Sequence, residues 1–167
     1  MQSLSDRLKG IEVFGIDIDG TLTDGTLSWA GDDWGWTQRF TVRDGEAILR
    51  LVARGIPVVP ISRNRTRCAR ARMQGLQLPL DWVGIADKLV ALSEVSARYR
   101  VAPAAIAYIG DGREDAAVFA QVGLGACVQD GHSLARAQAH LVTAARGGAG
   151  AVEELIDRLF AARGWTD

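Results

Sequence analysis

The sequence has 167 residues, of which 48% are hydrophobic and 23% charged, and these values predict one globular domain spanning residues 1–167. The formal net charge of −1 gives no general attraction to a polyanion, so we expect no nucleic-acid partner. The sequence shows neither a long apolar run nor a signal-type N-terminus, and its two cysteines are too few for a disulfide scaffold; we therefore expect a cytoplasmic protein with no membrane partner.

Short apolar runs alternate along the chain with helical patterns. Continuous apolar runs, typical of strands buried on both faces, occupy residues 13–16, 56–61, 82–85, 106–109 and 124–128, and a further strand is expected near 140–142. Helical spacing predicts helices over 45–54, 64–75, 88–100 and 114–122, and a shorter unit around 133–139 and a last helix from about 150 to 162 complete the chain. Asp44 is expected to be the N-cap of the first of these helices. The alternation predicts an α/β fold with a doubly wound, mostly parallel sheet, and a site beyond the carboxyl ends of its strands.

Residues 22–40 interrupt this alternation. The segment contains Gly25, Gly31 and Gly35, and short runs rich in Trp and Thr lie on either side of a Gly-Asp-Asp turn. This pattern predicts a β-hairpin that leaves the first strand close to the site. We refer to residues 22–40 as the hairpin flap.

Two carboxylates directly follow the first predicted strand. Asp17 and Asp19 are two residues apart, so a turn in the backbone between them can direct both toward one ligand. Mg²⁺, which prefers oxygen ligands, would offset the repulsion between them. The alternative interpretation is that both residues only cap a loop, because Asp is common in turns.

A hydroxyl group and a lysine lie at the end of the second predicted strand and at the start of a later predicted helix. Ser62 comes after the second strand, where it could bind a phosphate oxygen or serve as an ordinary helix N-cap. Lys88 begins a predicted helix, where a cation opposes the helix dipole. Because only Lys9 and Lys88 among the 19 basic residues are lysines, the compact ammonium at Lys88 suggests a specific use, although a solvated surface position is the alternative.

A second acidic pair follows the strand at 106–109. Asp111 could complete an oxygen-rich metal site, and Asp115 at the start of the next helix could hold a ligand or a metal-bound water. The alternative is an acidic helix start favoured by the dipole. The four elements together, each at a strand end or helix start, are harder to explain by chance than any one of them.

In this order the motifs resemble those of the haloacid dehalogenase-like phosphohydrolases, namely Asp-x-Asp, Ser or Thr, Lys, and Gly-Asp-x-x-x-Asp. The resemblance implies that Asp17 is the nucleophile that forms an aspartyl-phosphate and that Asp19 is the acid and base. It also implies that Ser62 and Lys88 bind the phosphoryl group. Mg²⁺ would be held by Asp17, the backbone carbonyl of Asp19, and Asp111.

The spacing of the motifs leaves no room for the cap domain that many family members insert. Phe40-Thr41-Val42-Arg43-Asp44-Gly45 resembles a segment of the capless 3-deoxy-D-manno-octulosonate 8-phosphate phosphatases and the related nonulosonate 9-phosphate phosphatases. The resemblance implies a Mg²⁺-dependent homotetramer in which the hairpin flap packs between subunits, and a phosphorylated sugar or sugar acid as substrate. Trp29, Trp34 and Trp36 on the flap favour burial in such an interface over a flap that folds onto its own domain.

We expect four further residues to contact the substrate: Thr21, Arg43, Arg63 and Arg146. The chain departs from the subgroup at Ser62-Arg63, where Thr-Gly-Arg is usual, so another residue could supply this hydroxyl. It also departs at Gly112, where Asp is frequent, and at Ala149 and Glu153, where Arg is frequent. The two missing arginines could have bound an anionic sugar acid, so these changes affect the expected identity of the substrate.

Two other functions stay open at this point. A receiver-like phosphoacceptor domain has a similar fold, although its phosphoacceptor would follow a central strand. A catalytically silent member of the family could act as an oligomeric binding module. A dinucleotide-binding domain is disfavoured, since no Gly-x-Gly-x-x-Gly turn follows the first strand.

Overall fold

The computed structural model describes residues 2–166 and contains a five-stranded parallel sheet with the order β4-β1-β5-β6-β7. Every residue of β1, β4, β5 and β6 is buried, as the continuous apolar runs predicted. The strands are β1 (Val13–Ile16), β4 (Val58–Pro60), β5 (Ile106–Gly110), β6 (Leu124–Cys127) and β7 (Leu141–Val142). The predicted doubly wound α/β fold is confirmed.

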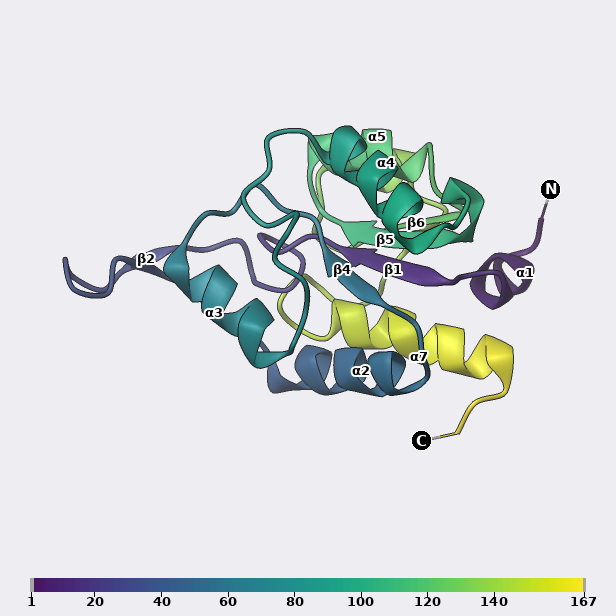
Figure 1. Cartoon of the computed structure of the whole chain (residues 1–167), viewed down its shortest axis with the longest axis horizontal. Helices are drawn as coiled ribbons and strands as arrows, with labels where there is room; N and C mark the ends of the chain where they lie inside the picture. Colours follow the sequence, from purple (N-terminus) through teal and green to yellow (C-terminus); the bar gives the residue numbers. More distant parts are fainter. Residues whose placement is uncertain (1, 167) are drawn as a thin grey trace.

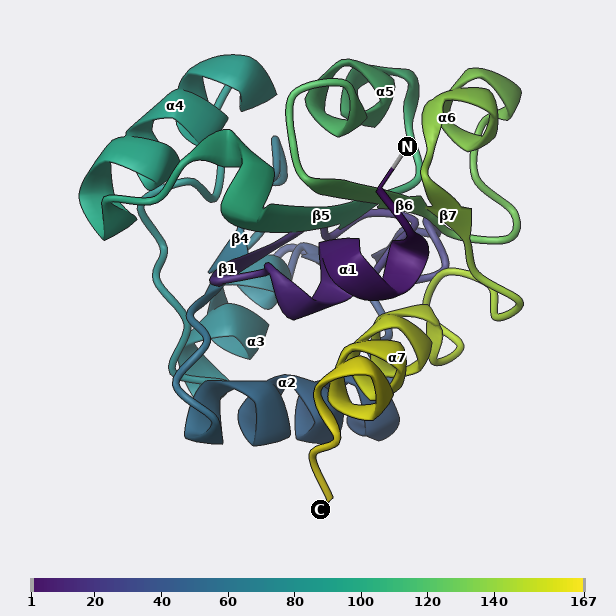
Figure 2. The same cartoon turned by 90° about the vertical axis from the view of Figure 1, so that its right-hand side faces the viewer.

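Helices cover both faces of this sheet (Figures 1 and 2). One face packs against α2 (Val42–Ala53), α3 (Arg67–Gly75) and α7 (Ala151–Arg163), and α1 (Leu4–Lys9) lies beside α7. The opposite face packs against α4 (Lys88–Tyr99), α5 (Arg113–Phe119) and α6 (Ser133–Gln138), and a short 3-10 helix, Pro103–Ala105, precedes β5. Among the helices of residues 2–166, none has the length and apolar character that a bilayer crossing requires.

The hairpin flap projects from the body of the molecule, at the end opposite α1 (Figure 1). Its strands β2 (Ser28–Trp29) and β3 (Trp36–Thr37) pair antiparallel. The rings of Trp29 and Trp36 pack edge to face with centroids 5.2 Å apart, and the side chain of Trp34 is largely exposed. The flap therefore presents aromatic surface to its surroundings.

Two predictions about local structure are wrong. Residues 82–85 do not form a strand: Val83 makes only an isolated bridge to Ser62, because turns enclose it and Gly84 has φ +95°. Asp44 is not the N-cap of α2, which begins after Thr41. Instead Asp44 is buried in the first turn, where its Oδ1 accepts the N–H of Glu153 at 2.9 Å and so satisfies a free donor at the start of α7.

Candidate active site

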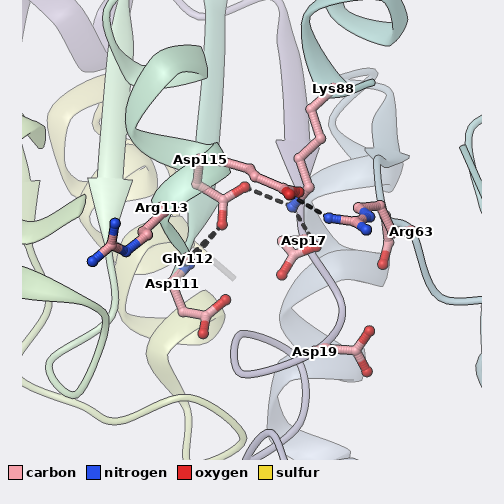
Figure 3. A pocket seen from close by; sticks show the side chains of 10 residues that line it. Asp17, Asp19, Arg63, Lys88, Asp111, Gly112, Arg113 and Asp115 are labelled. Carbon is pink, nitrogen blue, oxygen red and sulfur yellow. Dashed lines mark hydrogen bonds and ion pairs between the residues drawn. The ribbon is translucent and has the colours of Figure 1, made fainter. Parts of the chain in front are cut away.

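The carboxyl edge of the sheet carries a cavity of about 330 Å³ (Figure 3). Asp17 follows β1, Ser62 lies after β4, Asp111 follows β5, and Lys88 is the first residue of α4. Parallel strands that end at one edge bring these positions together although they are far apart in sequence. The residues lining the cavity are Asp17, Asp19, Ser62, Arg63, Lys88, Asp111, Gly112, Arg113, Glu114 and Asp115.

Lys88 is the centre of a buried ion cluster formed with Asp17, Asp115 and Tyr108. Its Nζ donates to Asp17 Oδ1 at 2.7 Å, to Asp115 Oδ1 at 2.6 Å and to the Tyr108 hydroxyl at 3.1 Å. Burial lowers the pKa of Lys88, but attraction to Asp17 and Asp115 outweighs this effect, and the net pKa is raised. The ammonium therefore remains charged beside the Asp17 carboxylate.

Local backbone capping fixes the members of this cluster. Asp87 is the N-cap of α4 and accepts the N–H of Leu89 at 2.8 Å, so Lys88 begins the helix. Asp115 Oδ2 accepts the backbone N–H groups of Asp111 at 3.0 Å and Gly112 at 2.8 Å. Both Asp115 oxygens are thus occupied by protein donors.

Tyr108 was missed by the sequence analysis, because it lies within an apolar strand. It is fully buried, and its hydroxyl donates to Asp115 Oδ1 at 2.7 Å. The available signal was the tyrosine itself, since a buried tyrosine usually needs a partner for its hydroxyl.

The acidic residues at the edge of the sheet fit a divalent cation. Carboxylate oxygens of Asp17, Asp111 and Asp115 lie within 4.8 Å of one another. Burial raises the pKa of Asp17 despite its contact with Lys88, and burial together with the Asp115 charge raises the pKa of Asp111 to about 6. A cation would stabilise the ionised forms, and carboxylate oxygens are the donors that Mg²⁺ prefers. Because Asp115 is occupied by protein donors, Asp17 and Asp111 are the better candidates for direct ligands.

Asp19 lies at the side of the cavity nearer the hairpin flap and accepts hydrogen bonds from two amides. Asn64 Nδ2 donates to Asp19 Oδ1 at 2.7 Å, and Gln38 Nε2 donates to the same oxygen at 2.5 Å. Neither amide is among the predicted site residues. For Asn64 the sequence held a signal, because this polar residue lies two positions after the predicted site residue Ser62. For Gln38 the sequence held no such signal.

Arginines predicted to contact the substrate have acidic partners. Arg63 lines the cavity and forms an ion pair with Glu114, which lines the same cavity. Arg43 lies in the first turn of α2, does not line the cavity, and pairs with Glu153 of α7 through Nε at 2.7 Å. Of Arg43 and Arg63, only Arg63 can therefore reach a ligand in this cavity.

Thr21 and Arg146 also lie outside the cavity lining. Thr21 is fully buried and its Oγ1 has no hydrogen-bond partner, while Arg146 pairs with Asp130 at 3.3 Å. The loop after Arg146 packs on the turn that follows Asp19: the N–H of Gly148 donates to the Thr21 carbonyl at 2.9 Å. A Cβ at Gly147 would lie 1.8 Å from the carbonyl oxygen of Gly20. Arg146 and Thr21 thus flank a tight contact between two loops.

Comparisons with known proteins show which family the chain belongs to. The model of the family described as haloacid dehalogenase-like hydrolase matches residues 84–155. The 3-deoxy-D-manno-octulosonate 8-phosphate phosphatase of Yersinia pestis is 38% identical over 157 residues, which cover 94% of this chain and 83% of the relative. The chain belongs to this phosphatase family of haloacid dehalogenase-like hydrolases. Membership makes the chain a phosphatase and removes the receiver-like alternative.

Solved structures of family members have the same fold. The Yersinia pestis phosphatase superimposes with a TM-score of 0.92 at 36% identity, covering 96% of this chain and 86% of the other. A Moraxella catarrhalis family member, solved in complex with a magnesium ion, a phosphate ion and a KDO molecule, has a TM-score of 0.89 at 29% identity, covering 95% and 90% of the two chains. The predicted family and fold are therefore both confirmed.

Proposed function

We propose that this phosphatase is a Mg²⁺-dependent phosphomonoesterase that acts through an aspartyl-phosphate on 3-deoxy-D-manno-octulosonate 8-phosphate or a related ulosonate phosphate. The observation that carries the proposal is the position of Asp17, which is buried at the sheet edge, bound by the Lys88 ammonium and adjacent to Asp111. A carboxylate beside a fixed cation suits in-line attack on a phosphoryl group, and this position supports the proposed role of Asp17.

In the first step, an oxygen of Asp17 forms a bond to phosphorus while the bond from phosphorus to the ester oxygen breaks. Lys88 binds Asp17 Oδ1, so we assign the attack to Oδ2. Asp19 gives its proton to the departing alkoxide, which leaves as the alcohol. Ser62 would donate a hydrogen bond to a phosphoryl oxygen, and the Lys88 ammonium, whose three hydrogens are donated within the protein, would attract the phosphoryl group by its charge; the positions of both residues in the cavity lining support this assignment.

In the second step, water attacks phosphorus, Asp19 takes its proton, and the bond between phosphorus and the Asp17 oxygen breaks to release phosphate. The same carboxyl group thus returns to its starting protonation state after one turnover. Bound to Asp17, Asp111 and the Asp19 carbonyl, Mg²⁺ would supply positive charge that reduces repulsion between the phosphate and the carboxylates.

The substrate assignment rests on the family. The relatives are named for 3-deoxy-D-manno-octulosonate 8-phosphate, and the cavity of this chain offers Arg63 to an anionic group. We further propose that residues 1–167 act as one domain and that the hairpin flap packs between subunits of a homotetramer. The exposed side chains of Trp29, Trp34 and Trp36 support this assembly, because an aromatic surface of this kind is typical of interfaces.

The test compares the wild type with Asp17→Asn, using p-nitrophenyl phosphate and 3-deoxy-D-manno-octulosonate 8-phosphate with and without Mg²⁺. We expect Mg²⁺-dependent release of phosphate by the wild type and none above background by Asp17→Asn. Asp24→Asn is the matched control, because Asp24 is an exposed acid of the following loop that bonds to Thr26 and does not line the cavity. Equal turnover by wild type and Asp17→Asn would refute the proposal.

A further inference from the structure

Asp19 is held by two neutral amides that reach it from different parts of the fold. Gln38 directly follows β3 of the hairpin flap, whereas Asn64 lies in the loop between β4 and α3. Both donate to Asp19 Oδ1, at 2.5 Å and 2.7 Å, and Asn64 Nδ2 also donates to Gln38 Oε1 at 2.8 Å. We call Gln38 and Asn64 the amide pair.

The orientation of each amide follows from its other contacts. Asn64 is buried, and its Oδ1 accepts the N–H of Thr66 at 2.8 Å, so its NH₂ group must face Asp19. One NH₂ hydrogen then reaches Asp19 and the other reaches Gln38 Oε1, which turns the NH₂ group of Gln38 toward Asp19 as well. The three side chains thus have a single consistent hydrogen-bonding arrangement.

The chemistry of the donors suits a carboxyl group that must both give and take a proton. Both donors to Asp19 are neutral amides, and both orient its carboxyl group through the same oxygen, Oδ1. The arginine of the same loop, Arg63, is paired with Glu114. Within residues 2–166, Asp19 Oδ2 accepts no hydrogen bond, so this oxygen is left for proton transfer.

We propose that Gln38 and Asn64 are positioning residues that fix Asp19 for proton transfer to the departing alcohol, and that Gln38 makes this geometry depend on the hairpin flap. The inference rests on the proposed role of Asp19 as acid and base. Gln38 is joined directly to Thr37 of β3, so displacement of the flap would withdraw one of the two donors. Esters whose departing alkoxide must be protonated are then cleaved efficiently only when the hairpin flap is in place.

The test measures kcat/KM for two esters that differ in their need for a proton. The departing nitrophenolate of p-nitrophenyl phosphate is stable without protonation, whereas the alkoxide of 2-glycerophosphate is not. For Gln38→Leu and Asn64→Asp we expect a loss of about 10- to 100-fold with 2-glycerophosphate and less than about threefold with p-nitrophenyl phosphate, within the range of general acid catalysis. Asn64→Asp keeps the acceptor for Thr66 but replaces the donor with a carboxylate that repels Asp19, and Gln38→Leu is the uncharged counterpart.

Two further variants make the outcome specific. Asp19→Asn should show the same selective loss to a larger extent, because it removes the proton donor itself. Thr37→Val is the control: its hydroxyl bonds to the Ser28 carbonyl within the flap at 3.1 Å, and we expect its ratio of the two kcat/KM values to match the wild type.

Equal losses on both esters, or no loss on either, would overturn the inference, because a general structural defect lowers both values together. Melting temperatures recorded for each variant identify such a defect. The proposed function is judged separately, by p-nitrophenyl phosphate turnover in the wild type and its loss in Asp17→Asn.

Discussion

Replacing Lys88 with methionine is expected to lower both stability and activity, because it leaves Asp17 and Asp115 facing each other without the ammonium between them. The side chain is 8% exposed and donates three hydrogen bonds, two of them to carboxylates. Breaking a buried ion pair by removing one partner costs about 3–5 kcal/mol. Since a buried carboxylate can take up a proton instead, we expect the lower value, about 3 kcal/mol.

This free energy corresponds to a measurable change in thermal unfolding. For a chain of this length, each kcal/mol shifts Tm by about 2–4 °C, so Lys88→Met should unfold about 6–12 °C below the wild type. Phosphatase activity should fall by at least about 100-fold, because a charge that stabilises the transition state is lost. Mg²⁺ should raise the Tm of the variant more than that of the wild type, since the cation then provides the missing positive charge.

Differential scanning calorimetry with and without Mg²⁺ measures both effects. Lys9→Met is the matched control, because Lys9 is the other lysine of the sequence and is exposed at the end of α1; we expect its Tm within about 2 °C of the wild type. If Lys88→Met also melted within about 2 °C of the wild type, the ion cluster would contribute little stability and the reasoning would be refuted.

Three other predictions concern the metal, a buried cap and a loop contact. Asp111→Asn should weaken Mg²⁺ binding by at least about tenfold without lowering the Tm of the metal-free protein, as titration calorimetry and thermal unfolding would show; unchanged Mg²⁺ affinity would remove Asp111 from the ligand set. Asp44→Ala should lower the free energy of unfolding by about 1–2 kcal/mol in urea, because the N–H of Glu153 loses its acceptor, and a change below about 0.5 kcal/mol would contradict this cap. Gly147→Ala should reduce activity because its Cβ would lie 1.8 Å from the Gly20 oxygen and displace the turn after Asp19, and full activity with p-nitrophenyl phosphate would show that this turn tolerates displacement.

Most of the sheet was predictable because β1, β4, β5 and β6 are buried throughout and therefore appear as uninterrupted apolar runs. The run at 82–85 has the same composition but forms no strand, because a single bridge from Val83 to Ser62 is all that the surrounding turns allow. Asp44 looked like a cap of its own helix and instead caps α7, a contact across 109 residues that no local pattern encodes.

The candidate site was predictable where residues lie at strand ends, since the topology of a parallel sheet brings these ends together. It was not predictable where a contact depends on side-chain direction. Tyr108 reads as an ordinary strand residue, yet it completes the ion cluster. Gln38 is 19 residues from Asp19, and its position depends on how the flap folds back toward the cavity.

The position of β1 between β4 and β5 also bears on when the site can assemble. β1 pairs on both sides with strands that come later in the chain, and the Asp17 carboxylate meets its ammonium partner only 71 residues further on. During synthesis from the N-terminus, Asp17 emerges before both Lys88 and the neighbouring strand β5, so its charge stays hydrated until these later residues are available. Long-range pairing of this kind is typical of slow folding steps, so the edge of the sheet that carries the candidate site forms only after distant parts of the chain have met.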